Sequence, residues 1–138
     1  MDSLVGPLML AAAEAGNIKR LISTLGYIQN IDFEDDRKET ALHKAAYRGY
    51  NDIIRILLYK GASIDAMNED NRTPLHHAVQ NSHTSTMELL LTKGASIEAT
   101  DKNSETPLHF AVRNSHPETV QLLLSKGKIL PRLHYSLK

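Results

Sequence analysis

The apolar residues of this chain fall into pairs of short segments, each with the spacing of one helical face. Between residues 68 and 100, Leu75, Ala78 and Val79 lie at positions i, i+3 and i+4. This spacing predicts a helix that buries one side. Thr73 directly before Pro74 is a favourable start for that helix, because Thr is a good N-cap residue and Pro fits the first helical position.

A second helix is predicted from about Ser85 to Lys93. Its inner stripe consists of Met87, Leu90 and Leu91. Gly94 follows directly and suits the left-handed residue that ends many helices. The unit therefore consists of a helix, a turn, a helix and a short connection to the next unit.

The whole pattern returns every 33 residues. Thr40, Thr73 and Thr106 are separated by this interval (73 − 40 and 106 − 73). A fixed period of this length indicates a repeat protein, in which each unit buries its apolar faces against its neighbours. We expect one domain over 1–138, with repeats at about 2–34, 35–67, 68–100 and 101–133 and a non-repeat tail at 128–138.

The repeated motif T-P-L-H-x-A, followed by a glycine, a Leu-Leu pair and G-A-x-I-D-A, resembles the ankyrin repeat from about Asp2 to Lys126. The resemblance implies an all-α solenoid of helix-turn-helix units with short β-hairpin or loop connections. It also implies a non-enzymatic adaptor or scaffold that binds a protein partner on a concave face. Four-repeat ankyrin inhibitors of cyclin-dependent kinases give kinase inhibition as an alternative.

Several residues depart from the motif. Ser82 and Ser115 stand where Gly49 closes the first helix of the second unit. If these positions are left-handed, each side chain costs roughly 1–2 kcal/mol. We expect the third and fourth units to be locally soft, because the hairpin glycine is also replaced, by Lys38, Asn71 and Ser104.

The two ends of the array are less regular than its middle. Pro7-Leu8-Met9-Leu10 takes the place of the T-P-L-H motif in the first unit, whose hairpin is expected to be distorted. Both terminal units are apolar, whereas the ends of a solenoid are normally polar. Three explanations stay open: the tail 128–138 folds back as a cap, the edges pack on a partner or a second copy, or the chain is part of a longer array. A further alternative to the adaptor is a structural unit that self-associates through its apolar C-terminal edge, Leu122–Leu124 and that tail.

Composition narrows the class of partner. The 138 residues include 16 basic and 16 acidic side chains and no cysteine. Balanced charge argues against nucleic-acid binding, and the absence of cysteine removes disulfides and Cys-based zinc sites. No apolar run approaches the length of a membrane span, and Leu4–Ala13 follows an acidic residue and fits the repeat phase, unlike a signal peptide. We expect a cytoplasmic or nuclear protein without membrane insertion.

The seven histidines invite a metal or catalytic interpretation. Three of them, His43, His76 and His109, occupy the T-P-L-H position, where the resemblance implies hydrogen bonds to the N-cap Thr and nearby backbone. Neighbours in this series lie about 10 Å apart, too far to share a zinc ion with bonds of about 2.1 Å. We predict no catalytic residue, cofactor or metal site, and we expect solvated surface positions for the remaining candidates, His77, His83 and His116.

The positions that would face a partner differ between units, while the core positions do not. Tyr and Arg dominate interface energetics, so Tyr47 with its neighbouring arginines is the strongest candidate set. The arginines alternate with acidic residues, which favours a protein partner over DNA or RNA. The sequence does not identify that protein. The first unit offers Ser3, Leu4, Glu14 and Ala15. The predicted partner-binding residues of the other units are Asp36, Arg37, Glu39, Tyr47, Arg48, Glu69, Asp70, Arg72, Gln80, Asn81, Lys102, Asn103, Glu105, Arg113 and Asn114.

Overall fold

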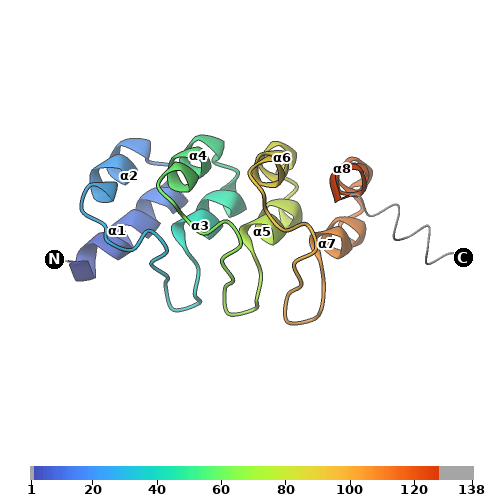
Figure 1. The fold of residues 1–138 in the computed structure, drawn as a ribbon, viewed down its shortest axis with the longest axis horizontal. Helices are drawn as coiled ribbons and strands as arrows, with labels where there is room; N and C mark the ends of the chain where they lie inside the picture. Colours follow the sequence, from blue (N-terminus) through green and yellow to red (C-terminus); the bar gives the residue numbers. More distant parts are fainter. Residues whose placement is uncertain (1, 128–138) are drawn as a thin grey trace, which may run out of the picture.

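The computed structural model describes residues 2–127, which form eight α-helices in four consecutive pairs (Figure 1). Figure 1 shows the odd-numbered helices in one layer and the even-numbered helices in a second layer, with the loops projecting below the first. The all-helical solenoid expected from the sequence is confirmed. The helices are α1 (Asp2–Ala15), α2 (Ile18–Leu25), α3 (Ala41–Arg48), α4 (Asn51–Tyr59), α5 (Pro74–Gln80), α6 (Thr84–Thr92), α7 (Pro107–Arg113) and α8 (Pro117–Gly127).

The core lies between the two layers and between successive pairs. On α5, Leu75, Ala78 and Val79 are buried as predicted, and on α6 Met87 and Leu90 are buried as well. Small side chains on the odd-numbered helices let α1, α3, α5 and α7 stack directly on one another. No pair of helices buries its apolar faces alone, so the stack is the unit of stability.

A Thr–His pair starts three of the odd-numbered helices. In α5 the backbone N–H of Thr73 donates to His76 Nδ1 at 3.1 Å, and His76 Nε2 lies 3.0 Å from the carbonyl oxygen of Glu105 in the next unit. Nδ1 accepts, so the proton is on Nε2, which donates to that carbonyl. His43 makes the same bond to the carbonyl of Arg72 at 2.9 Å. The structural role expected for these histidines is confirmed.

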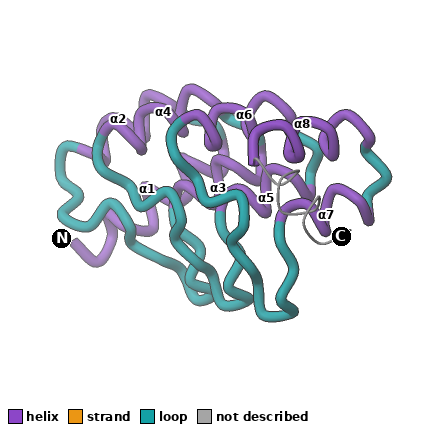
Figure 2. The backbone as a smooth tube through the Cα atoms, turned by 45° about the vertical axis from the view of Figure 1, so that its right-hand side comes forward, coloured by secondary structure: helices purple, strands orange, loops and turns teal. Residues whose placement is uncertain are grey.

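The loops between units are turns rather than β-hairpins. No strand occurs among residues 2–127. Each loop is closed by a backbone hydrogen bond such as Asn68 N–H to Arg72 O at 3.0 Å, and adjacent loops are joined by Glu69 N–H to Arg37 O at 2.9 Å. Of the two forms expected for the connections, β-hairpin or loop, the described residues therefore adopt the loop (Figure 2).

Non-glycine residues adopt left-handed backbone conformations where the sequence suggested it. Ser82 has φ of 59° and Ser115 has φ of 56°, at the positions equivalent to Gly49 with φ of 78°. The ring of His83 packs against Gly49 so closely that a Cβ there would lie 2.9 Å from it. The residues that replace the loop glycine also have left-handed backbone conformations; they are Lys38, Asn71 and Ser104.

The first helix of the first unit is longer than its equivalents. The helix α1 begins at Asp2, so Ser3 and Leu4, two of the predicted partner-facing positions, belong to a helix, whereas the equivalent residues of the next unit lie in a loop. The helix α1 includes Pro7, and strong helix formers, Leu, Met and Ala, follow that residue. Leu4 is 68% exposed, Ile22 of α2 is 56% exposed, and this end of the stack presents apolar side chains to solvent.

Two other expectations concern membrane insertion and the tail. None of the described helices is long and apolar enough to cross a membrane. The tail 128–138, with the proposals that it caps the array or mediates self-association, lies outside the described residues.

Candidate protein-binding surface

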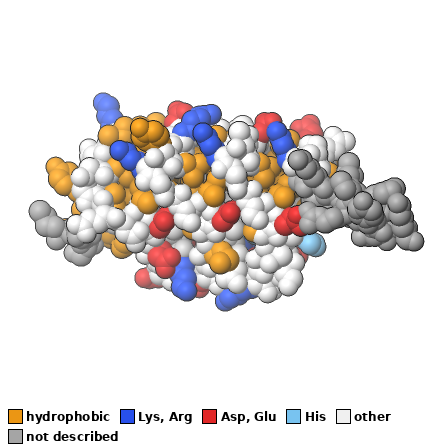
Figure 3. Space-filling view, in the orientation of Figure 1, with side chains coloured by type: hydrophobic (Ala, Val, Ile, Leu, Met, Phe, Trp, Pro, Cys, Tyr) orange, Lys and Arg blue, Asp and Glu red, His pale blue; other side chains and the backbone are white. Residues whose placement is uncertain are grey.

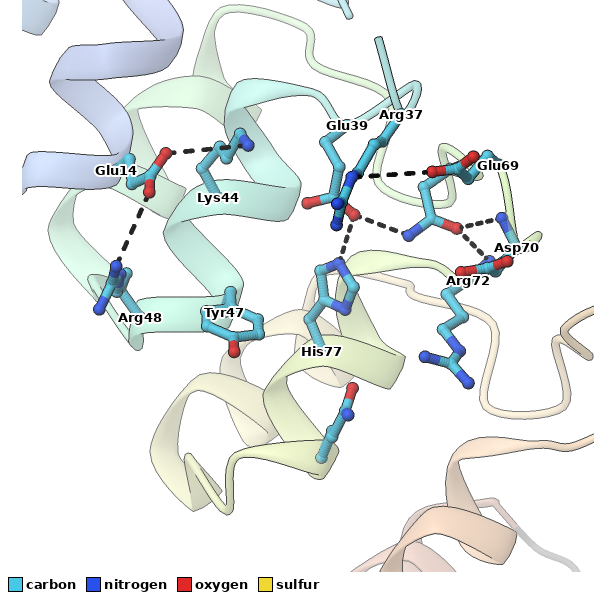
Figure 4. A pocket seen from close by; sticks show the side chains of 12 residues that line it. Glu14, Arg37, Glu39, Lys44, Tyr47, Arg48, Glu69, Asp70, Arg72 and His77 are labelled. Atoms are coloured by element: carbon cyan, nitrogen blue, oxygen red, sulfur yellow. Dashed lines mark hydrogen bonds and ion pairs between the residues drawn. The ribbon is translucent and has the colours of Figure 1, made fainter. Parts of the chain in front are cut away.

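A hollow of about 300 Å³ opens between α3, α5 and two adjacent loops (Figure 4). Nine of the predicted partner-facing residues line it together with three others. We call it the central hollow, and its lining consists of Glu14, Arg37, Glu39, Lys44, Tyr47, Arg48, Asn68, Glu69, Asp70, Arg72, His77 and Gln80.

One wall of the central hollow is the end of α3. Tyr47 is 44% exposed there, and the guanidinium carbon of Arg48 lies 5.8 Å from the centre of its ring. Lys44 lies one turn earlier and pairs with Asp35 at 2.9 Å and with Glu14 of α1 at 3.8 Å. Residues 44, 47 and 48 share one side of α3 because they are three and four positions apart.

The floor of the central hollow is a pair between His77 and Glu39. His77 Nε2–H donates to Glu39 Oε2 at 2.7 Å, and Asn68 Nδ2 donates to the same oxygen at 2.6 Å (Figure 4). His77 is only 6% exposed, so its assignment to the solvated surface was wrong. Its ring is covered because it packs edge-on against Tyr47 and His43.

A signal for this burial is present in the sequence. His77 is one repeat after Lys44 and one repeat before Phe110 (44 + 33 and 110 − 33). Phe110 is 3% exposed, and an aromatic residue at an equivalent position marks that position as covered.

Glu39 is ionised at neutral pH. Burial alone would raise its pKa, but the hydrogen bond and charge of His77, with the hydrogen bond from Asn68, lower the pKa to about 2. His77 Nδ1 has no hydrogen-bond partner, and it is the one buried side-chain polar atom in the described part of the chain for which this is true. The floor therefore combines a fixed negative charge with an unused hydrogen-bonding atom.

Equivalent side chains hold the loops that rim the central hollow. Asn68 Oδ1 accepts the backbone N–H groups of Asp70 and Arg72, each at 2.9 Å. Asp101, one repeat later, repeats this pattern, and its Oδ2 accepts from Arg72 Nε at 3.3 Å. Glu39 and Arg72, whose side chains are 13% and 26% exposed, thus also fix the loops.

Two predicted partner residues tie first helices together. Asn81 Nδ2 donates to the carbonyl of Tyr47 at 2.8 Å, and Asn114 Nδ2 donates to the carbonyl of Gln80 at 3.0 Å. His83 Nε2–H also donates to the carbonyl of Tyr47, at 2.9 Å, and is half-buried. It was expected on the solvated surface, and that was wrong because the preceding repeat covers one side of its ring. His116 is exposed, as expected.

The other predicted residues lie beside the central hollow rather than in it. Glu105 and Arg113 pair with each other on the fourth unit. The guanidinium groups of Arg72 and Arg113 lie 5.0 and 5.3 Å from the ring centre of Phe110. Three remaining residues are exposed on the loops: Asp36, Lys102 and Asn103.

The acidic residues of the I-D pairs are also structural. Asp32 Oδ1 accepts the backbone N–H of Ser63, and Asp65 Oδ1 accepts that of Ser96, both at 2.9 Å. Each carboxylate thereby joins its own unit to the next. Among residues 2–127, no group of three or more His, Asp or Glu side chains is placed to hold a metal ion.

Comparison with known families agrees with the geometry. A family model described as ankyrin repeats (3 copies) matches residues 8–101 and 61–132. Among curated proteins, none matches this chain. The two matched ranges overlap and together span 8–132, which includes every residue that lines the central hollow. The chain belongs to the ankyrin repeat family.

Proposed function

We propose that this protein is an adaptor or scaffold without enzymatic activity, and that it binds a protein partner through the central hollow and the adjoining loops. Ankyrin repeats are generally protein–protein interaction modules. The observation that carries the proposal is the exposed pair Tyr47 and Arg48 at the edge of an open hollow. Tyr and Arg beside a recess are the residue types that contribute most to protein interfaces.

The charge pattern supports a protein partner. Basic and acidic side chains are mixed over the face seen in Figure 3. Around the central hollow, Arg37 lies 3.9 Å from Glu69, and Arg48 lies 3.7 Å from Glu14. Such a mixed field matches a protein surface of complementary polarity, whereas a nucleic acid would require a basic stripe.

Peptide selection tests this proposal. The immobilised full chain would be used to select binders from a random-peptide display library, and the Kd of one selected peptide would be measured by fluorescence anisotropy. Tyr47→Ala is expected to weaken binding at least about tenfold, which corresponds to about 1.4 kcal/mol. The matched control is Tyr59→Ala, which removes a tyrosine that is 86% exposed on α4, in the other layer.

The control variant should bind within about twofold of the wild type. An equal loss for both variants, or a larger loss for Tyr59→Ala, would contradict the proposal. Failure to select any binder would count against it as well.

Self-association is a second candidate. The exposed apolar side chains of Leu4, Leu8 and Ile22 at the first helix pair favour a contact at the end of the stack. Light scattering that shows a monomer across concentrations would exclude it. Kinase inhibition rests on repeat number alone, and failure to inhibit any cyclin-dependent kinase would remove it.

A further inference from the structure

The basic side chains of the central hollow already have acidic partners. Lys44 Nζ lies 2.9 Å from Asp35, and Arg72 Nε lies 3.3 Å from Asp101. Arg37 and Arg48 pair with Glu69 and Glu14. Each basic side chain of the lining thus already lies beside a carboxylate of the same protein.

Two carboxylate groups of the central hollow keep acceptor oxygens that no described residue uses. The carboxylate of Asp70 is exposed and makes no side-chain hydrogen bond or ion pair with the described residues, whereas the other acidic side chains of the lining are paired. Glu39 receives both of its hydrogen bonds on Oε2, so Oε1 accepts none. Oε1 is not among the buried unpartnered atoms, so solvent reaches it.

A further observation comes from the floor itself. His77 Nδ1 is buried and unpartnered, although almost every buried polar atom in a protein finds a partner. The side chain is 8% exposed and lies between Tyr47 and Glu39 in Figure 4. Because Nδ1 is covered, the free atom of the floor that another molecule can reach is Oε1 of Glu39.

We infer that the central hollow receives an arginine side chain from the partner, an inference that rests on the proposed function. A guanidinium carries five N–H donors in a planar fork and bonds two carboxylates at once. Glu39 Oε1 and the Asp70 carboxylate supply such acceptors, one at the floor and one at the rim. The exposed ring of Tyr47 offers a face on which a guanidinium stacks.

The test uses the selected peptide of the preceding section with the full chain. Each arginine of the peptide would be replaced in turn by glutamine and by lysine, and affinities would be measured for the wild type, Asp70→Asn and Asp52→Asn. Asp52 is the matched control, because it is an exposed carboxylate on α4, in the other layer, and does not line the central hollow.

One peptide arginine is expected to be essential, with at least about a tenfold loss for Arg→Gln and a smaller loss for Arg→Lys. Asp70→Asn should weaken binding about threefold or more for the parent peptide but not for the Arg→Gln peptide, and Asp52→Asn should have no effect.

Two results would overturn the inference in distinguishable ways. If Tyr47→Ala abolishes binding but no arginine of the peptide matters, the arginine site is wrong and the proposed binding face stands. If binding survives Tyr47→Ala, or if no peptide is selected, both are contradicted.

Discussion

At the scale of single residues, buried histidines determine how this protein responds to acid. His43 and His76 are fully buried and use both ring nitrogens in hydrogen bonds, Nδ1 to the Thr that starts their own helix and Nε2 to a carbonyl of the next unit. Burial lowers the pKa of His43 to about 4 and lowers the pKa of His76 as well. Both rings are therefore neutral in the folded protein at neutral pH.

This arrangement predicts a loss of stability between about pH 6.5 and pH 4. In the unfolded chain a histidine titrates near 6.5, so in this window the unfolded state binds protons that the folded state does not. The free energy of unfolding is then highest above pH 6.5 and falls as the pH is lowered toward 4, by up to about 1.4 kcal/mol per pH unit for each extra proton bound. Below pH 4.5 the lowered pKa of Glu39 adds a further loss in the same direction.

Urea unfolding followed by far-UV circular dichroism, at a series of pH values from 7.5 to 4, measures this profile. His116→Gln is the control, because His116 is exposed, and the substitution should leave the profile unchanged. A free energy of unfolding that stays constant from pH 7 to pH 4.5 would show that the two rings are not held neutral.

At the scale of elements, each loop is joined to the next by a pair of side chains, and the acidic member of the pair changes from one loop to the other between repeats. An amide, Asn68, faces the carboxylate of Glu39, and one repeat later a carboxylate, Asp101, faces the guanidinium of Arg72. Each pair thus brings one negative charge and a complementary donor to the same place. The chemical match within a pair, rather than either residue alone, stabilises the loops.

These two side-chain pairs predict a compensating double substitution. Arg72→Glu places a carboxylate against Asp101, whose side chain is 1% exposed, and should destabilise the protein by about 3 kcal/mol. Adding Asp101→Asn recreates the pairing of Asn68 with Glu39 and should recover at least about 1 kcal/mol. Urea unfolding of Arg72→Glu, Asp101→Asn and the double variant gives the coupling free energy between the two positions. Strictly additive effects would show that the two positions do not interact. The control is Arg37→Glu, because Arg37 lies 3.9 Å from Glu69 and its side chain is 80% exposed. This substitution should change the free energy of unfolding by about 0.5 kcal/mol or less.

The sequence predicts features that depend on residues close together in the chain, and it misses features that depend on contacts between distant residues. Helix starts such as Thr73 and helix ends such as Gly49 are encoded locally, so helices and left-handed positions could be placed by spacing alone. The burial of His77 and His83 depends on atoms of the preceding repeat, more than thirty residues away, and it was missed. Glu39 was predicted to face a partner and lines the central hollow, but its bond to His77 could be seen only in the three-dimensional stack.

At the scale of the whole molecule, the same unit repeated in register produces a surface that no single unit contains. The central hollow draws its lining from α1, α3, α5 and the loops before α3 and α5. Neighbouring units fix one another through side chains such as Asn81 and Asp65, which reach backbone groups across the repeat boundary. A partner that binds in the central hollow therefore contacts a rigid surface made by adjacent repeats.

The most direct test of this account is hydrogen–deuterium exchange of the full chain with and without a saturating selected peptide. Binding at the central hollow predicts slower exchange in the loops at 35–39 and 68–72 and at the end of α3, with little change in α4 and α6. Protection confined to the even-numbered helices, or to the first helix pair alone, would contradict the assignment of the central hollow as the protein-binding surface.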